Sequence, residues 1–272
     1  MKGRRLAGPE TAGILFVTGT GTGAGKTVLT ALLLDHLRRR GVAALAMKPF
    51  SAGGLGDALL FSGLQAGELP LDELNPFRFA SPVAPLAAAR AEGVRVALAD
   101  AVGCVSRVAR RCAWLLVEGA GGLLSPLGEG FTAVEMIRSL ECGVVVAARD
   151  ELGVVNQALL TLRHLETAGR PAGAVALMGK ARPDDSAAQN AVLIEEWSRG
   201  VPVARVPWIG RNCRSAAALG AAAARGGGAL ERAIEAVLQG CGDHWTRSVN
   251  GVAGARRAGS IPGWGKPRPE KY

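Results

Sequence analysis

The sequence predicts an α/β protein with a doubly wound, mainly parallel β-sheet and helices on both of its faces. Apolar runs of strand length alternate with helical stretches, and the runs are continuously apolar, which is typical of parallel strands covered on both sides. These runs are Ile14–Thr18, Val42–Met47, Trp114–Glu118, Val144–Ala148, Ala174–Met178 and Val203–Val206. In such sheets, ligands bind at the carboxyl ends of the strands.

Helical stretches separate most of these strands. In the first, leucines at positions 29, 32, 33 and 37 share one helical face, and Gly169 marks the end of the fourth. The predicted helices are Thr27–Arg40, Asp100–Arg111, Ala133–Leu140, Val154–Ala168, Ser186–Ser198 and Ser215–Leu238. Residues 50–95 are rich in Gly, Ala and Pro and receive no assignment.

We expect a single α/β domain at residues 13–240. Residues 1–12 are basic and expected to be flexible. Residues 241–272 form a basic, Gly- and Pro-containing tail without apolar periodicity, and we expect this tail to be disordered.

Composition narrows the classes of function. With 49% hydrophobic and 20% charged residues, the 272-residue chain has enough apolar residues for an ordinary core. No apolar run approaches the roughly 20 residues of a membrane span, and no cleavable signal pattern is present, so we expect a soluble cytoplasmic protein without a membrane partner. The net charge of +9 is concentrated at the two ends and lacks aromatic interleaving, so no nucleic-acid partner is expected. The five cysteines show no C-x-x-C spacing and are expected to be reduced thiols.

A glycine-rich loop, VTGTGTGAGKTV at Val17–Val28, follows the first strand. The dinucleotide pattern G-x-G-x-x-G fails, because its last glycine would fall at Ala24 or Lys26. The P-loop pattern G-x-x-x-x-G-K-[ST] is matched at its end, but its first glycine is Gly19, one residue too early. The loop is therefore a P-loop that is one residue longer at its front.

This loop favours a nucleoside triphosphate. Its glycines let backbone N–H groups turn toward anionic oxygens, Lys26 supplies a cation, and Thr27 offers a hydroxyl to a magnesium ion. The positive end of the following helix adds to the attraction. A flexible turn between strand and helix is the alternative, but such a turn does not require the Lys-Thr pair.

Two carboxylates could complete a magnesium site. Glu118 ends a buried strand and is followed by three glycines in four residues, where a backbone can approach phosphate closely. Asp57 precedes an apolar stretch, and a helix N-cap is an equally good interpretation of its local sequence. Lys48 also follows a strand; a solvated strand end is possible, but with no acid partner close in sequence we favour anion binding.

The sequence resembles the dethiobiotin synthetase family, ATP-dependent enzymes of the P-loop NTPase type that close the ureido ring in biotin synthesis. The similar stretches run in family order over residues 13–210: FVTGTGTGAGKTV, MKPFSAGG, GDALL, LNPFRFASPVAP, LLVEGAGGLLSPL, LGVVNQALLTLRHLETAG and VPWIG. The longer loop itself resembles the family pattern G-T-x-T-x-x-G-K-T. The expected domain at residues 13–240 would then be a P-loop synthetase domain.

The resemblance implies a reaction and a set of site residues. Diaminononanoate and carbon dioxide form a carbamate, which attacks the γ-phosphate of ATP, and the second amine then closes the ring. The implied catalytic residues are Lys26 and Lys48, the implied substrate contacts Ser51 and Ala52, and the implied magnesium ligands Thr27, Asp57 and Glu118. The implied nucleotide contacts are Gly23, Ala24, Gly25, Lys26, Thr27, Val28, Asp57, Glu118, Gly119, Ala120, Gly121, Pro207 and Trp208. A homodimer is implied in which the turn Gly153–Asn156 of one subunit contacts substrate bound to the other.

Several positions depart from the family pattern. Gly21 replaces an acid of the loop, and Ala52 stands where a hydroxyl is usual, with Ser51 one position early. Ala84 and Leu86 replace the Ser and His of P-x-S-P-H, and Leu177 replaces an asparagine that contacts adenine. Gln157 stands where His is common, and residues 149–151 are unusually charged. The departures concern substrate and base recognition rather than phosphate chemistry.

Three alternatives stay open. A ParA- or MinD-like ATPase switch would carry a lysine near the front of the loop, and residues 18–24, TGTGTGA, contain none. A cobyrinic-acid-type amidoligase would need a glutaminase domain, for which the sequence after residue 210 is too short. A divergent member could bind nucleotide and magnesium without synthetase turnover.

Overall fold

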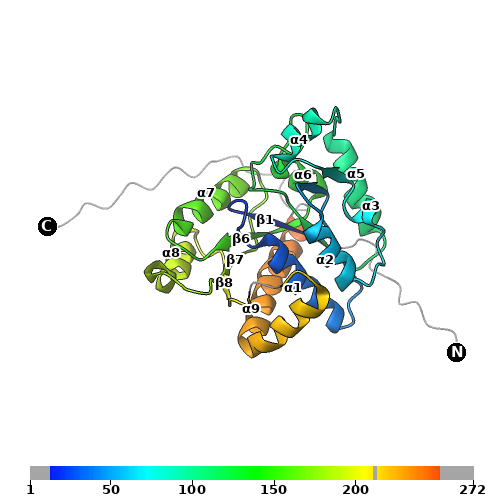
Figure 1. The fold of residues 1–272 in the computed structure, drawn as a ribbon. Coiled ribbons are helices and arrows are strands. Elements are labelled where there is room, and N and C mark those ends of the chain that lie inside the picture. Colours follow the sequence, from blue (N-terminus) through cyan, green and yellow to red (C-terminus); the bar gives the residue numbers. More distant parts are fainter. Residues whose placement is uncertain (1–12, 211–212, 252–272) are drawn as a thin grey trace, which may run out of the picture.

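The computed structural model describes residues 13–210 and 213–251, with side chains up to residue 242. At its centre is a six-stranded sheet in the order β2-β5-β1-β6-β7-β8, in which every pairing is parallel. The strands are β1 (Gly13–Gly19), β2 (Ala44–Met47), β5 (Trp114–Glu118), β6 (Gly143–Arg149), β7 (Ala174–Met178) and β8 (Val203–Val206) (Figure 1). All the predicted strands are confirmed, with small shifts of their ends.

Strand β1 lies between β5 and β6 and is buried on both faces. Its register places Val17 opposite Glu118 of β5 and opposite Val145 of β6. Leu15, Phe16 and Val17 are almost inaccessible to solvent. This double coverage explains why the strands are continuously apolar in sequence.

Helices cover both faces, which confirms the doubly wound fold class. Helices α1 and α9 contact each other and lie over one face, α1 against β1, β2 and β5, and α9 against β6, β7 and β8 (Figure 1). Helices α5 to α8 lie over the other face, where they contact β5, β1, β6 and β8 respectively. These helices are α1 (Lys26–Arg39), α5 (Leu98–Ala109), α6 (Ala133–Leu140), α7 (Val154–Thr167), α8 (Asn190–Trp197) and α9 (Ala216–Gly251). Within the described ranges, none of the helices combines the length and apolarity needed to cross a bilayer.

Residues 50–95, which the sequence left unassigned, fold into short elements beside the main sheet. Strands β3 and β4 pair in parallel to form a second, two-stranded sheet. The ring of Phe50 stacks on Phe77 at a centroid distance of 4.8 Å, and Phe131 packs edge-on at 6.2 Å. The elements are β3 (Phe50–Ala52), α2 (Gly56–Leu64), α3 (Leu71–Leu74), β4 (Phe77–Phe79) and α4 (Pro85–Ala91).

Two predicted boundaries are wrong. The helix predicted at Ser186–Ser198 is divided into a 3₁₀-helix at Asp185–Ala188 and α8, because the Asp184 carboxylate caps the first turn separately. Helix α9 continues past residue 240 to Gly251, with a non-helical residue at Gly227, so residues 241–251 are helical rather than part of a disordered tail. The buried Cys241 packs against Gly173, which fixes this part of the helix. The remaining predicted ends, residues 1–12 and 252–272, lie outside the described residues.

Two leucines that differ in burial should differ in their contribution to the free energy of unfolding. Leu33 on α1 is 0% exposed, whereas Leu59 on α2 is 57% exposed. We expect Leu33→Ala to lower the free energy of unfolding by about 2–5 kcal/mol, because it removes buried methyl groups and leaves a cavity. Leu59→Ala should change it by less than about 1 kcal/mol. Urea denaturation of both variants measures the difference, and equal losses would contradict the assigned orientation of α1.

Candidate active site

The candidate site lies where the carboxyl ends of three neighbouring strands meet. The glycine-rich loop follows β1, Lys48 follows β2, and Glu118 is the last residue of β5. Because β5 lies between β2 and β1, these segments are brought together although they are far apart in sequence. The site is therefore at the edge of the sheet that the sequence predicted.

The loop between β1 and α1 leads into a helix whose first turn has neither a capping side chain nor an acidic residue. Gly25, at the N-cap of α1, has φ 94° and ψ 13°, and no side chain accepts a hydrogen bond from the first turn. A Cβ at Gly25 would lie 2.7 Å from Cγ of Met178, so the loop packs tightly against β7. No acidic residue occupies the first turn. The positive end of α1 is thus available to a phosphate group.

Lys26 folds back over this loop. Its Nζ donates a hydrogen bond to the carbonyl oxygen of Gly21 at 2.8 Å, and the side chain is largely buried. Burial lowers the pKa of Lys26, although the negative charge of Glu118 opposes the shift. An anion bound in the loop would favour the charged form of this lysine.

A cluster of Lys48, Glu118, Asp57 and Thr27 lies beside the loop. Nζ of Lys48 donates to Oε1 of Glu118 at 2.7 Å and also pairs with Oδ2 of Asp57, while the Thr27 hydroxyl donates to the same Glu118 oxygen at 2.9 Å. Burial raises the pKa of Glu118 in spite of the nearby Lys48 charge. Burial acts to lower the pKa of Lys48, but the two carboxylates outweigh it and the pKa is raised. Lys48 is therefore a cation at neutral pH.

This cluster bears on two expectations. Anion binding by Lys48 was favoured in part because no acid lies near it in sequence. The fold nevertheless gives it two acid partners, since Glu118 ends the adjacent strand and Asp57 lies on the following helix, α2. Asp57 is not a helix N-cap, since Leu55 occupies that position and Asp57 lies within the first turn of α2.

The oxygen atoms of the cluster fit a hard divalent cation. Oε2 of Glu118 is buried and has no hydrogen-bond partner among the described residues. The Thr27 hydroxyl and the half-exposed Asp57 carboxylate lie in the same cluster. The described residues contain no group of three or more His, Cys, Asp or Glu side chains that could hold a metal. Two carboxylates and a hydroxyl are oxygen donors of the kind that suit an ion such as Mg²⁺, which keeps waters and phosphate oxygens among its ligands.

The segment after Glu118 approaches the glycine-rich loop. The backbone N–H of Gly119 donates to the carbonyl of Val17 at 3.0 Å. Gly121 has φ 68°, and a Cβ on the next residue, Gly122, would lie 3.4 Å from Cα of Gly21. The predicted contacts Gly119, Ala120 and Gly121 thus lie beside the loop, on the side of Glu118.

A pocket of about 950 Å³ opens on the other side of the loop. Five predicted nucleotide contacts line it: Gly23, Gly25, Val28, Pro207 and Trp208. Ala24 is buried in the loop. Four residues that the sequence did not indicate also line the pocket: Met178, Gly179, Lys180 and Arg182. Arg149 ends β6 and lines the pocket as well, and Lys180 lies two residues after the end of β7. A charged residue at the carboxyl end of a strand is the signal by which these two could have been found.

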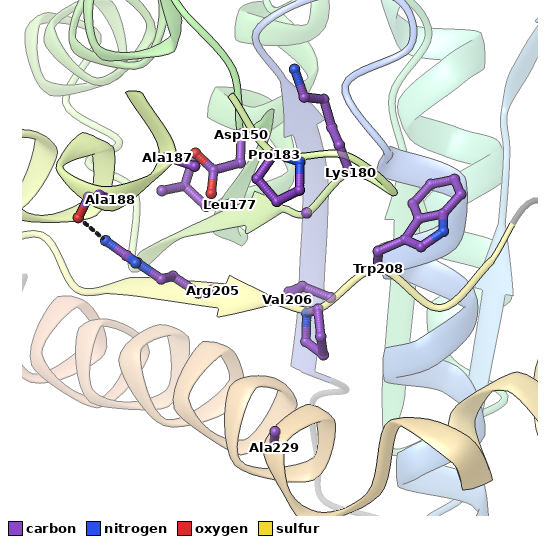
Figure 2. Close-up of a pocket in the computed structure, with 12 residues that line it drawn as sticks. Asp150, Leu177, Lys180, Pro183, Ala187, Ala188, Arg205, Val206, Trp208 and Ala229 are labelled. Carbon is purple, nitrogen blue, oxygen red and sulfur yellow. Dashed lines mark hydrogen bonds between the residues drawn. The ribbon is translucent and has the colours of Figure 1, made fainter. Parts of the chain in front are cut away.

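A second pocket of about 400 Å³ adjoins the first, since Gly179, Lys180, Pro207 and Trp208 line both. Leu177, the position at which an adenine contact was considered, lines this second pocket (Figure 2). Its walls come from the ends of β7 and β8, the 3₁₀-helix and α9.

The two predicted substrate contacts, Ser51 and Ala52, differ in their exposure to solvent. Ser51 is buried, and its hydroxyl donates to Oδ1 of Asn75 at 2.8 Å, while Nδ2 of Asn75 donates to the Lys48 carbonyl at 2.5 Å. Ala52 is partly exposed. The Ser51–Asn75 pair therefore fixes the backbone at Lys48, and the substrate role of Ser51 stays a prediction.

Sequence comparisons connect the chain with known proteins. A family model described as an AAA domain matches residues 14–212. The ATP-dependent dethiobiotin synthetase BioD of Anaeromyxobacter dehalogenans (strain 2CP-C) is 41% identical over 211 residues, which cover 76% of this chain and 95% of the relative. The ATP-dependent dethiobiotin synthetase BioD of Bacillus subtilis (strain 168) is 34% identical over 198 residues, covering 69% and 84%.

Solved structures share the fold at low identity. The MinD cell division protein of Aquifex aeolicus has a TM-score of 0.53 at 16% identity, with coverage of 84% of this chain and 96% of that one. A ParA family ATPase from Chlorobium tepidum TLS has a TM-score of 0.51 at 14% identity, with coverage of 88% and 98%. At these identities the likeness concerns the fold alone.

Substitution by alanine should weaken nucleotide binding at one glycine of the loop and leave it nearly unchanged at another. We expect Gly25→Ala to weaken binding of a nucleoside triphosphate about tenfold or more, because alanine is strained at φ 94° and its Cβ would contact Met178. Gly21→Ala should bind within about twofold of the wild type, since a Cβ there meets nothing within 4 Å. Isothermal titration calorimetry measures both affinities, and equal effects would contradict the loop conformation described above.

Proposed function

Because the chain belongs to the dethiobiotin synthetase family, we propose that it converts diaminononanoate, carbon dioxide and ATP into dethiobiotin, ADP and phosphate. The observation that carries this proposal is the cluster of Lys48, Glu118, Asp57 and Thr27 beside the phosphate-binding loop. The curated relatives, named ATP-dependent dethiobiotin synthetases, support it because they match 76% and 69% of this chain.

The loop and the cluster divide the reaction between them. The amides at the start of α1 and the Lys26 ammonium bind the triphosphate and stabilise the charge that develops during phosphoryl transfer. A carbamate, formed from one amine of the substrate and carbon dioxide, attacks the γ-phosphorus through an oxygen and releases ADP. The second amine then attacks the carbamate carbon, expels phosphate and closes the ring.

Thr27, Asp57 and Glu118 are proposed to hold magnesium. Magnesium, when bound, neutralises charge on the phosphate oxygens. The unpartnered Glu118 oxygen supports this assignment, since a buried carboxylate oxygen without a donor is costly unless a cation contacts it. The Thr27 hydroxyl already lies 2.9 Å from the other oxygen of Glu118.

Lys48 is proposed to stabilise the carbamate. Its pKa is raised, so it carries a positive charge at neutral pH, and its side chain lies between the two acids beside the loop. The Ser51–Asn75 pair supports this role because it fixes the strand end that carries the lysine.

A homodimer is proposed from the surface beside α7. Leu152, which is 83% exposed, and Leu160 flank the turn Gly153–Asn156, and both are large apolar side chains that face solvent in the single chain. A second copy that covers these two side chains would also contact the turn between them. We also propose a cytoplasmic location, because the curated relatives are named as biosynthetic enzymes.

The first test is a reaction with purified protein, ATP, magnesium, bicarbonate and diaminononanoate. Dethiobiotin and ADP should form in equal amounts, and removal of magnesium with EDTA should stop the reaction. Phosphate release that is independent of the diamine would favour an ATPase switch. Nucleotide binding without dethiobiotin would instead favour a divergent member, which the replacements at Ala52, Ala84 and Leu86 would then explain.

The second test separates chemistry from nucleotide binding. We expect Lys48→Ala to lower kcat for ring closure about 100-fold or more, because it removes the cation beside the carbamate, while ATP affinity changes by only a few-fold. Arg111→Ala, which removes an exposed cation paired with Glu73, is the control and should keep full turnover. Thermal melting confirms that both variants are folded, and unchanged kcat in Lys48→Ala would remove this residue from the mechanism.

A further inference from the structure

The second pocket contains a carboxylate that the proposed mechanism does not use. Asp150 follows β6 directly and is only 9% exposed. Its Oδ1 accepts a hydrogen bond from Nδ2 of the buried Asn190 at 2.8 Å, and its backbone N–H donates to the carbonyl of Met178 at 2.9 Å. Among the described residues, nothing donates to Oδ2 and no cation pairs with the side chain. Oδ2 is not among the buried atoms of the described residues that lack a partner, so it is open to the pocket, and a hydrogen-bond donor that enters the pocket can reach it.

The surroundings of Asp150 suit a flat, mainly apolar ring. Apolar side chains make up most of the pocket wall, and Figure 2 shows Asp150 close to Leu177 and Ala187, with Trp208 across the pocket. The other wall residues without a charged group include Pro183, Ala188, Val206, Pro207 and Ala229. Small-molecule sites commonly combine such apolar walls with few, well-placed polar groups.

The pocket is also connected to the phosphate-binding loop. Gly179, Lys180, Pro207 and Trp208 line both pockets, and the larger one is lined in addition by Gly23 and Gly25 of the loop. A nucleotide with its phosphates at the loop can therefore extend across the first pocket and place its base in the second.

We propose that Asp150 selects the base of the nucleotide by accepting a hydrogen bond from an exocyclic amino group. The inference rests on the proposed function only in assuming that a nucleoside triphosphate binds the loop. Asn190 occupies Oδ1, so one oxygen faces the pocket, and this suits the single amino group of adenine or cytosine. Hypoxanthine and uracil carry a carbonyl there instead, which would bring two acceptors together. Leu177 has no polar atom with which to make the same distinction.

The test compares matched nucleotides by calorimetry, without diamine. Wild-type protein should bind ATP about tenfold or more tightly than inosine triphosphate, and CTP more tightly than UTP, because a hydrogen bond to a charged group is lost in each second member. In Asp150→Asn, the Asn190 amide should hold the new carbonyl and leave an NH₂ group toward the pocket. This variant should lose or reverse both preferences, while its affinity for inorganic tripolyphosphate stays that of the wild type.

Asp72→Asn is the matched control, since it removes one negative charge by the same substitution, and Asp72 pairs with Arg78 and lines neither pocket. It should keep the wild-type preferences. Equal affinities within each pair for the wild type would overturn the proposal without any variant, as would an Asp150→Asn protein with unchanged preferences or an Asp72→Asn protein that loses them equally. Base selection by the wild type without dethiobiotin formation would support this inference and contradict the proposed function.

Discussion

The buried carboxylate of Glu118 is the constraint around which the site is arranged. It lies at the end of β5, within the sheet, and is 1% exposed. Such a charge is tolerated only when donors or cations surround it. Lys48 follows β2 on one side of β5, while Thr27 lies in the first turn of α1, which follows β1 on the other side. Asp57 pairs with the same lysine. The order β2-β5-β1 is therefore what makes the cluster possible.

The fold and the phosphate side of the site could be predicted from the sequence for the same reason. Doubly covered parallel strands are continuously apolar, and polar residues follow their carboxyl ends, so Lys48 and Glu118 were found by position. Lys26 and Thr27 were found from the P-loop pattern. The small sheet of β3 and β4 could not be predicted, because its strands are very short and stabilised by contacts with distant aromatic rings such as Phe131.

The side-chain partners of several site residues could not be predicted, because these partners lie far away in the sequence. Lys48 meets Glu118 because β5 lies beside β2, and it meets Asp57 because α2 packs near the end of β2. Neither arrangement is visible in the local sequence. Asp150 looked like one charge in a charged turn, and only the position of Asn190, forty residues later, shows that one of its oxygens is held while the other has no donor among the described residues. Similarly, Ser51 stands one position early for the substrate motif, and the sequence does not show that its hydroxyl donates to Asn75.

The position of α9 has a consequence for biosynthesis. This helix covers β6, β7 and β8 and contacts α1, yet it follows every strand in chain order, and its backbone near Cys241 rests on Gly173. On the ribosome, the sheet face beneath it stays uncovered until the helix has left the exit tunnel. The apolar strands are then exposed during elongation, when unfolded chains are prone to aggregate. Docking of α9 is therefore the step that removes the apolar face of β6, β7 and β8 from solvent as the protein folds.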